Sequence, residues 1–167
     1  MLPAQELSEA SEEDLEAVAK QLGRPTRGTR AIAHRCPCGR PDVVETMPRL
    51  ADGTPFPTLY YLTCPRATAE CSRLESAGVM KEMFQRLQED PELASEYQKA
   101  HEGYLERRES IGSVPEIEGI SAGGMPNRVK CLHVLLGHAL AAGPGVNPLG
   151  DEVIEMIEPW WTAGPCV

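Results

Sequence analysis

The feature that most constrains the fold of this chain is a change of pattern near residue 64. Residues 31–64 contain three short runs rich in β-branched and aromatic residues, AIAHRC, VVETMPRL and TLYYLTC, with Gly- and Pro-containing turn signals between them. From residue 67 to about residue 158, apolar residues recur at helical spacing instead. Strands followed by helices favour an α+β fold. We therefore predict a small three-stranded antiparallel sheet packed against several helices.

An acidic helix is predicted before the sheet. Ser11 begins the sequence SEED, which is typical of a capping box, and Gly23 supplies a stop signal. The next stretch is basic and has no acid; its five arginines are Arg24, Arg27, Arg30, Arg35 and Arg40. This Arg24–Arg40 face either binds an anion or is neutralised by the acidic helix.

Composition narrows the class of protein. The 167 residues carry a net charge of −9, which argues against nucleic-acid binding by the whole chain. The N-terminal sequence is acidic and lacks the apolar run of a signal peptide, and no segment has 18 consecutive apolar residues. We therefore expect a cytoplasmic protein that does not enter the membrane. We divide it into an acidic N-terminal helix or arm (residues 1–23), a single α+β domain (24–158) and a C-terminal tail (159–167).

Three of the six cysteines are predicted to form a metal site, since disulfides are uncommon in a reducing compartment. Strands one and three of a three-stranded meander run parallel, so Cys36 and Cys64 should meet at one end of the sheet. The helix containing RVKCLHVLLGH (residues 128–138) would bring Cys131 there. Three thiolates with one histidine, for which we choose His133, form a Cys₃His zinc set. An iron–sulfur cluster is the alternative cofactor.

The geometry of a regular helix limits this site. If residues 128–142 are helical, Cys131 and His133 lie about 160° apart around the axis, and Cys131 and His138 lie about 10 Å apart along it. Either histidine would then need a distorted helix to join Cys131 at one metal. We expect Pro126 to open this helix.

The other three cysteines have weaker assignments. Cys38 shares a turn with Cys36, but the single residue between them is shorter than the usual zinc spacing. Cys71 is interpreted as a buried thiol without a function. Cys166 is expected to be free, unless a docked tail adds it as a ligand.

Polar residues near the predicted metal set are candidates for a substrate site, and they are Arg128, Lys130, His138 and Asn147. The sequence GGMPNRVK places two glycines before a predicted helix N-terminus, where free N–H groups favour an anion. A loop that merely requires glycine geometry is the alternative interpretation.

Four segments, RCPCGRPDVV, DGTPFPTLYYLTCP, SRLESAG and VKCLHVLLGHALAAGPGVNPLGD, together resemble the bacterial domain-of-unknown-function family numbered 501, especially its actinobacterial branch. The resemblance extends from about Arg24 to Asp151. It implies no catalytic residues, because no activity is established for the family. The matching motif positions are Cys36, Cys64, Cys131, His133, His138, Asn147, Pro148 and Gly150. The family's gene neighbourhood implies a protein partner linked to cell division or polyphosphate metabolism.

Three functions follow from these residues. The first is a zinc protein whose Cys/His site binds or hydrolyses a small anionic substrate. The second is an interaction module with a structural zinc ion, which binds an acidic partner through its Arg24–Arg40 face. The third is a metal-free thiol enzyme that uses Cys131 as its nucleophile.

Overall fold

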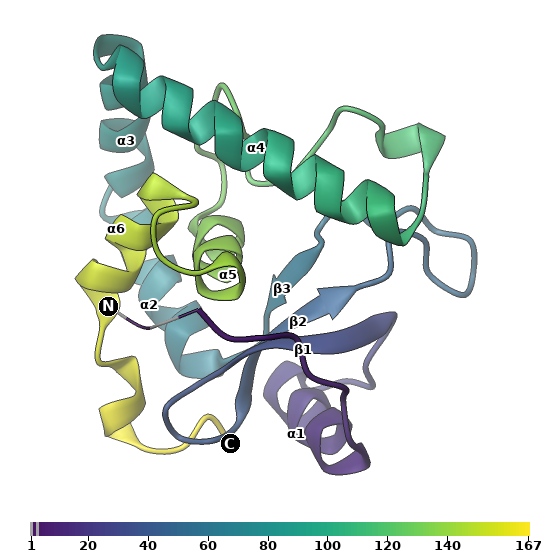
Figure 1. Cartoon of the computed structure of the whole chain (residues 1–167). Helices are drawn as coiled ribbons and strands as arrows, with labels where there is room; N and C mark the ends of the chain where they lie inside the picture. Colours follow the sequence, from purple (N-terminus) through teal and green to yellow (C-terminus); the bar gives the residue numbers. More distant parts are fainter. Residues whose placement is uncertain (1, 3) are drawn as a thin grey trace.

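The computed structural model describes residue 2 and residues 4–167, and it confirms the predicted α+β class (Figure 1). The strands are β1 (Thr29–Arg35), β2 (Pro41–Thr46) and β3 (Tyr60–Leu62). The α-helices are α1 (Glu12–Leu22), α2 (Pro65–Ser76), α3 (Val79–Glu89), α4 (Pro91–Ile111), α5 (Leu132–Ala142) and α6 (Pro148–Ile157). The short 3₁₀ helices are η1 (Pro115–Ile117) and η2 (Trp160–Ala163).

The sheet has the order β1–β2–β3, and both neighbouring pairs are antiparallel, as predicted. Side chains alternate between its two faces. Ile32 and Val44 pack with Val18 of α1 on one face, whereas Ala33 and Val43 join the main core on the other. The sheet is therefore buried on both sides, with α1 on one and α5 on the other (Figure 1).

Helix α5 lies at the centre of the main core, and two glycines let it approach its neighbours closely. A Cβ atom added at Gly137 would lie 2.9 Å from the carbonyl oxygen of Tyr60 in β3. A Cβ atom added at Gly150 of α6 would lie 2.2 Å from the carbonyl oxygen of Leu135 in α5. Because protein interiors are close-packed, a larger side chain at either position would displace α5.

Helix α4 crosses the core next to the loops that follow it (Figure 1). Asp90 caps its N-terminus by accepting hydrogen bonds from the backbone N–H groups of Glu92 and Leu93. Near the other end, Arg108 is buried and its guanidinium donates to four backbone carbonyls, those of Pro57, Ile117, Ile120 and Ser121. Arg108 thus satisfies backbone carbonyl groups in the segment before β3 and in the segment after α4.

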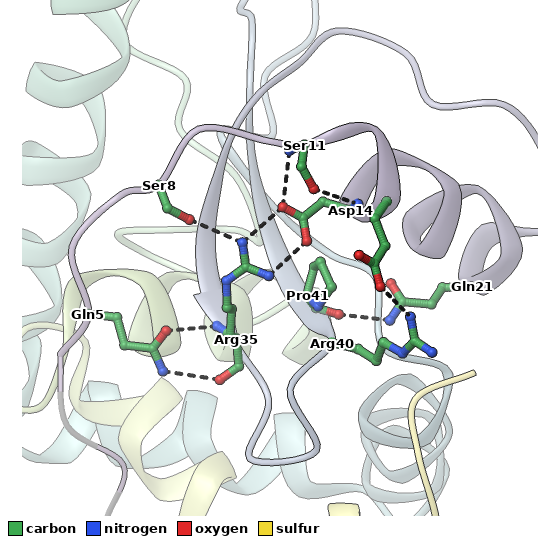
Figure 2. Close-up of polar contacts among 9 residues, drawn as sticks. Gln5, Ser8, Ser11, Asp14, Gln21, Arg35, Arg40 and Pro41 are labelled. Carbon is green, nitrogen blue, oxygen red and sulfur yellow. Dashed lines mark hydrogen bonds and ion pairs between the residues drawn. The ribbon is translucent and has the colours of Figure 1, made fainter.

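The start of α1 confirms the predicted capping box and neutralises part of the basic face (Figure 2). Asp14 exchanges hydrogen bonds with Ser11, and its two carboxylate oxygens accept from the Arg35 guanidinium at 2.8 and 2.9 Å. The hydrogen bond from Arg35 lowers the pKa of Asp14 to about 2. Arg40 Nη1 lies 4.0 Å from Glu13 Oε1. Gly23 ends the helix in the left-handed conformation, as predicted.

The predicted start of the fifth helix is wrong. The chain is not helical from Pro126, and α5 begins only at Leu132. The preceding backbone N–H groups bond to the glycine loop instead, since Lys130 N donates to Gly123 O and Arg128 N donates to Gly124 O, both at 2.8 Å. The glycine-rich segment therefore binds the backbone of the residues that precede α5. This agrees with the interpretation offered above that the loop requires glycine for its geometry.

The C-terminal tail is docked on the body of the protein. Trp160 is buried, and Cys166 is fully buried. The Gln21 side chain of α1 donates to the carbonyl oxygens of Cys166 (3.0 Å) and Pro41 (2.7 Å), which places the tail beside the turn between β1 and β2. Among the described residues, no helix is both long and apolar enough to cross a membrane.

Candidate metal centres

The first group of possible metal ligands combines Glu75, Cys131 and His133, which we call the trio. Their ligand atoms all lie within 4.8 Å of one another, and all three side chains are partly buried. Glu75 lies near the end of α2, Cys131 is the N-cap residue of α5, and His133 lies in its first turn. The trio therefore sits where two helices meet.

The extended backbone of Cys131 explains why it reaches His133. Cys131 has φ −152° and ψ 111°, so it stands outside the helix, and its Sγ lies 3.7 Å from His133 Nδ1. The calculation that separated these two side chains by about 160° is wrong, because it assumed a helix that included both. The pair forms without any distortion of α5.

Hydrogen bonds hold the trio in place. Glu75 Oε2 accepts from the backbone N–H of Leu132 at 2.9 Å and lies 3.2 Å from His133 Nδ1. Ser72 Oγ lies 3.3 Å from the other ring nitrogen, Nε2. The Glu75 carboxylate thus caps α5 from a different helix, and Ser72 and Glu75 together orient the imidazole ring.

The electrostatics of the trio favour a charged pair. Burial raises the pKa of the Cys131 thiol, but hydrogen bonds with the His133 ring and the Val134 backbone N–H outweigh it, so the pKa lies below its ordinary value. The hydrogen bond with Cys131 raises the pKa of His133, and the charge of Glu75 acts in the same direction. Both shifts favour the thiolate and the imidazolium over the neutral pair, and Cys131 lies at the positive end of the helix dipole.

A cavity of about 620 Å³ opens beside the trio, with Cys131 and His133 in its wall. Its other walls come from β3, the start of α2 and the end of α1, and they include Tyr60, Tyr61, Thr63, Thr68, Gln21 and Val134. Among the described residues that line it, none is Arg or Lys. The cavity therefore offers hydroxyl groups, aromatic rings and apolar surface.

The second group is made of thiols, Cys36, Cys38, Cys64 and Cys166, and we call it the thiol cluster. Cys166 Sγ lies 2.9 Å from Cys64 Sγ and 3.4 Å from Cys36 Sγ. The sulfur atoms of Cys36, Cys38 and Cys166 lie within 4.8 Å of one another. All four cysteines are free, and Cys38 alone among them is not fully buried.

The thiols of this cluster influence one another's protonation. The hydrogen bond with Cys166 is the largest influence that lowers the pKa of Cys36 to about 6, and it also lowers the pKa of Cys64. The same contacts, first that with Cys36, raise the pKa of Cys166. Cys71 has no place in either group, and burial raises its pKa to about 12.

The structure divides the four predicted metal ligands between the two groups. Cys36 and Cys64 both contact Cys166 in the thiol cluster, whereas Cys131 and His133 belong to the trio. Sequence reasoning missed Glu75 altogether and gave Cys38 and Cys166 no assigned role. The proline before Cys166 and the shared turn of Cys36 and Cys38 were the available signals. Nothing in the sequence near Glu75 distinguishes it from the other acids of its helix.

The predicted substrate residues are not gathered at the trio. His138 and Asn147 are buried, and their side chains contact each other, with Asn147 Nδ2 3.2 Å from His138 Nδ1. Burial lowers the pKa of His138 to about 4, so its ring is neutral. Asn147 also caps α6 by accepting from the Gly150 N–H. Arg128 and Lys130 are exposed and lie outside the wall of the cavity.

Ion pairs occupy most of the Arg24–Arg40 face. Four of its five arginines lie within 4.0 Å of a carboxylate, in the pairs Arg27–Asp52, Arg30–Glu45, Arg35–Asp14 and Arg40–Glu13. The acids come from α1, from β2 and from the loop after β2. The contacts therefore favour neutralisation of the basic face, but the acidic helix, to which this was assigned above, supplies only two of the four acids.

Fold and geometry define an α+β protein with two groups of side chains that could hold a metal ion. Residues 32–155 match the family described as "Protein of unknown function (DUF501)", and because the match covers most of the chain, the protein belongs to this family. The resemblance seen in the motifs is confirmed, while the actinobacterial branch stays a prediction. No curated protein and no solved structure matches the chain. The trio lies within the matched residues, whereas Cys166 lies beyond them.

Proposed function

We propose that the protein binds a zinc ion through Glu75, Cys131 and His133, and that it uses the side of the ion facing the cavity to bind and hydrolyse a small molecule. This places the Cys/His site predicted from the sequence at Cys131 and His133, with Glu75 in place of the other thiols. The observation on which the proposal rests is the convergence of three different ligand atoms, two of them from residues that line a cavity, Cys131 and His133.

The direction of that convergence favours a metal over a proton relay. In a nucleophile–histidine–acid triad, the nucleophile and the acid bond to opposite nitrogens of the ring. Here Cys131 Sγ and Glu75 Oε2 both approach His133 Nδ1, at 3.7 and 3.2 Å. Ser72 holds the opposite nitrogen, which is the usual arrangement of the outer partner of a metal-binding histidine.

The number and type of ligands favour a catalytic rather than a structural zinc site. Catalytic zinc sites take three protein ligands from Cys, His and Asp or Glu, and they leave a position for water or substrate. When bound, such an ion lowers the pKa of a water molecule and polarises a carbonyl or phosphoryl oxygen. The partial exposure of the trio fits that role, because a substrate must reach it from the cavity.

The lining of the cavity bears on the substrate. The described lining residues include neither Arg nor Lys. The positive charge that attracts an anionic group of the substrate would therefore come from the metal ion. The rest of the molecule would then lie against hydroxyl groups and the rings of Tyr60 and Tyr61. An anionic substrate stays a prediction, and the wall favours one whose remaining part is neutral and partly apolar.

Cobalt substitution tests the proposal, because the visible spectrum of bound Co²⁺ reports its ligands. We expect Glu75→Gln and Cys131→Ser to weaken Co²⁺ binding at the trio by more than about tenfold. Glu70→Gln, on the same helix but paired with Arg73, should leave it unchanged. Azide should change the spectrum of the wild type if a coordination position is open. Unchanged cobalt affinity in both trio variants would refute the site.

A specific geometry supports a thiol enzyme as the second candidate. Cys131 is the N-cap residue of α5, lines the cavity and lies beside an imidazole, as a thiol nucleophile requires. Metal-free protein should then be alkylated by iodoacetamide at Cys131 much faster than at the half-buried Cys38. Equal rates at the two thiols would remove this candidate.

The interaction module receives less support. Most of the arginines on which it relies are already paired with acids of the same chain. An acidic partner would have to displace these carboxylates. The partner linked to cell division or polyphosphate metabolism, which the family resemblance implied, stays a prediction that these contacts do not support.

A further inference from the structure

We propose that the protein has a second, closed metal centre, in which Cys36, Cys38, Cys64 and Cys166 bind one zinc ion that fastens the C-terminal tail to the sheet. This centre is independent of the proposed function of the trio, with which it shares no residue. Its role is structural, because four protein ligands leave no position for a substrate.

The first argument is that four thiols converge from three distant segments. Cys36 and Cys38 lie in the turn after β1, Cys64 caps the N-terminus of α2, and Cys166 lies in the tail. Cys166 Sγ is 2.9 Å from Cys64 and 3.4 Å from Cys36. With zinc–sulfur bonds of about 2.3 Å, tetrahedral ligands lie roughly 3.8 Å apart. Cys166 would therefore move slightly away from Cys36 and Cys64, and Cys64, which is not among the three sulfur atoms within 4.8 Å of one another, would move toward the thiols of the turn.

The second argument is the chemistry of the donors. Thiolates select soft or borderline ions, above all zinc, and a tetrahedral set of four is typical of structural zinc sites. Backbone N–H groups already point at the sulfur atoms, since Ala67 N donates to Cys64 Sγ at 3.5 Å and Cys38 N bonds to Cys36. Such hydrogen bonds disperse the negative charge that four thiolates carry.

The third argument is the charge around the cluster. Asp42 is fully buried, its Oδ1 lies 2.7 Å from His34 Nδ1, and its Oδ2 has no hydrogen-bond partner among the described residues. Its charge acts on both Cys36 and Cys64. Burial raises the pKa of Asp42, and a negative charge on it raises the pKa of both thiols. A cation near the thiols, either the His34 ring or a metal ion held by the sulfur atoms, would lower the cost of burying these groups together.

Hydrogen bonds to the C-terminal tail hold Cys166 next to the other thiols of the cluster. Gln21 donates to the Cys166 carbonyl, and Arg66 Nε donates to the Pro165 carbonyl at 3.1 Å. These two side chains come from α1 and α2, so the tail contacts both helices. Cys166 lies after the residues that match the family, so this centre combines three thiols of the family region with one beyond it, and Gln21 of α1, which precedes the matched residues, holds the tail.

The experiment uses the full chain without a His-tag, kept reduced, and measures metal content by elemental analysis with Co²⁺ spectra of the exchanged protein. We expect Cys166→Ser to lose one metal equivalent, the intense thiolate-to-cobalt absorption and the slow hydrogen exchange of residues 160–167. Cys131→Ser should lose only the equivalent at the trio, so the two centres fail separately. Cys71→Ser is the matched control, a buried thiol of α2 outside both groups, and should keep both equivalents.

If Cys166→Ser does not fold, Cys38→Ser replaces a less buried thiol of the same cluster and should weaken the same metal equivalent by at least tenfold. Three results would overturn the proposal. One is full metal content and an unchanged cobalt spectrum in Cys38→Ser. Another is wild-type protein that takes up no ion outside the trio. The third is a Cys64–Cys166 disulfide found by mass spectrometry in protein kept under reductant.

Discussion

The thiol cluster and the trio use similar donors in opposite settings. The thiol cluster has four sulfur atoms, three of its cysteines are fully buried, and its members come from the hairpin turn, α2 and the tail. The trio has one sulfur, one nitrogen and one carboxylate, all partly exposed, and its Cys131 and His133 line a large cavity. A closed set of thiolates suits an ion that holds segments together, and an open mixed set suits an ion that meets a substrate.

The thiol cluster and the trio also differ in which parts of the chain they connect. The trio joins two helices that both lie in the family region, and its cavity faces the outside. The thiol cluster joins the family region to the end of the chain. Burial and the number of protein ligands, rather than the presence of cysteine, therefore separate the two proposed roles.

The largest effect should come from removing the metal ions one after the other. A weak chelator should strip the trio first and lower thermal stability slightly, whereas a strong chelator should also strip the thiol cluster. An ion bound at about 1,000 times its Kd stabilises the folded state by about 4 kcal/mol. Calorimetry with parallel metal analysis measures both steps. A single step that releases all metal would contradict the comparison.

The next largest effect should come from disturbing the packing of α5 against α6, because α5 carries two of the three residues of the trio. In Gly150→Ala, the new Cβ would meet the Leu135 carbonyl at 2.2 Å, so α5 and α6 must separate at a cost of about 1–3 kcal/mol. We expect weaker metal binding at the trio, which α5 carries, and unchanged binding at the thiol cluster. Gly103→Ala in α4 meets no atom within 4 Å and should be neutral or stabilising by about 0.5–1 kcal/mol. Cobalt titration and urea unfolding check both variants.

A smaller effect should follow from Ser72→Ala. Its hydroxyl holds His133 Nε2 at 3.3 Å, and outer partners of this kind are worth about 10- to 100-fold in metal affinity. We expect the lower end of that range, because Ser72 is exposed. Ser76→Ala, an exposed serine of the same helix, is the control. Competition with a chromophoric chelator gives the affinity, and equal values for the two variants would mean that the ring is oriented by Glu75 alone.

The smallest effect is a loss of folding stability at low pH that is caused by His138. This residue lies in the buried part of α5, away from the end that carries the trio. The pKa of His138 is about 4 in the folded protein and about 6.5 when unfolded, so protonation favours unfolding. The folding stability that neutral His138 contributes is complete above about pH 6.5 and is lost as the pH falls toward 4. At pH 5.5 the loss relative to pH 7 should be about 1 kcal/mol.

This measurement is made on metal-free protein by urea unfolding, so that release of metal ions by acid does not contribute. His138→Gln should flatten the pH dependence between pH 7 and 5, although His101, whose pKa is also lowered by burial, keeps part of it. A His138→Gln profile as steep as that of the wild type would show that other groups cause the acid loss.

The sequence predicted the parts of the fold that local signals control. The three strands, the capping box at Ser11 and the stop at Gly23 all follow from periodicity and side-chain chemistry within a few residues. The placement of Cys36 and Cys64 at the same end of the sheet also followed, because strand direction in a meander determines it, but each of the two thiols contacts Cys166. These features depend on short segments whose behaviour is the same in many proteins.

The trio could not be predicted in this way. Its geometry depends on where α5 begins, and apolar periodicity placed that start at Pro126 instead of Leu132. The true start depends on Glu75, which accepts the Leu132 N–H from 57 residues away. Cys166 likewise joined the thiol cluster only because Gln21 and Arg66 hold the tail in place.

The sequence by itself therefore determined the class of fold, its helices and strands, and a supply of thiols and imidazoles in one chain. Tertiary structure alone decided which of them meet. The physical reason is that periodicity and capping act between residues a few positions apart, whereas a ligand group needs atoms within 4.8 Å of one another regardless of their separation in sequence. Such proximity exists only once α2, α5, the sheet and the tail have packed together.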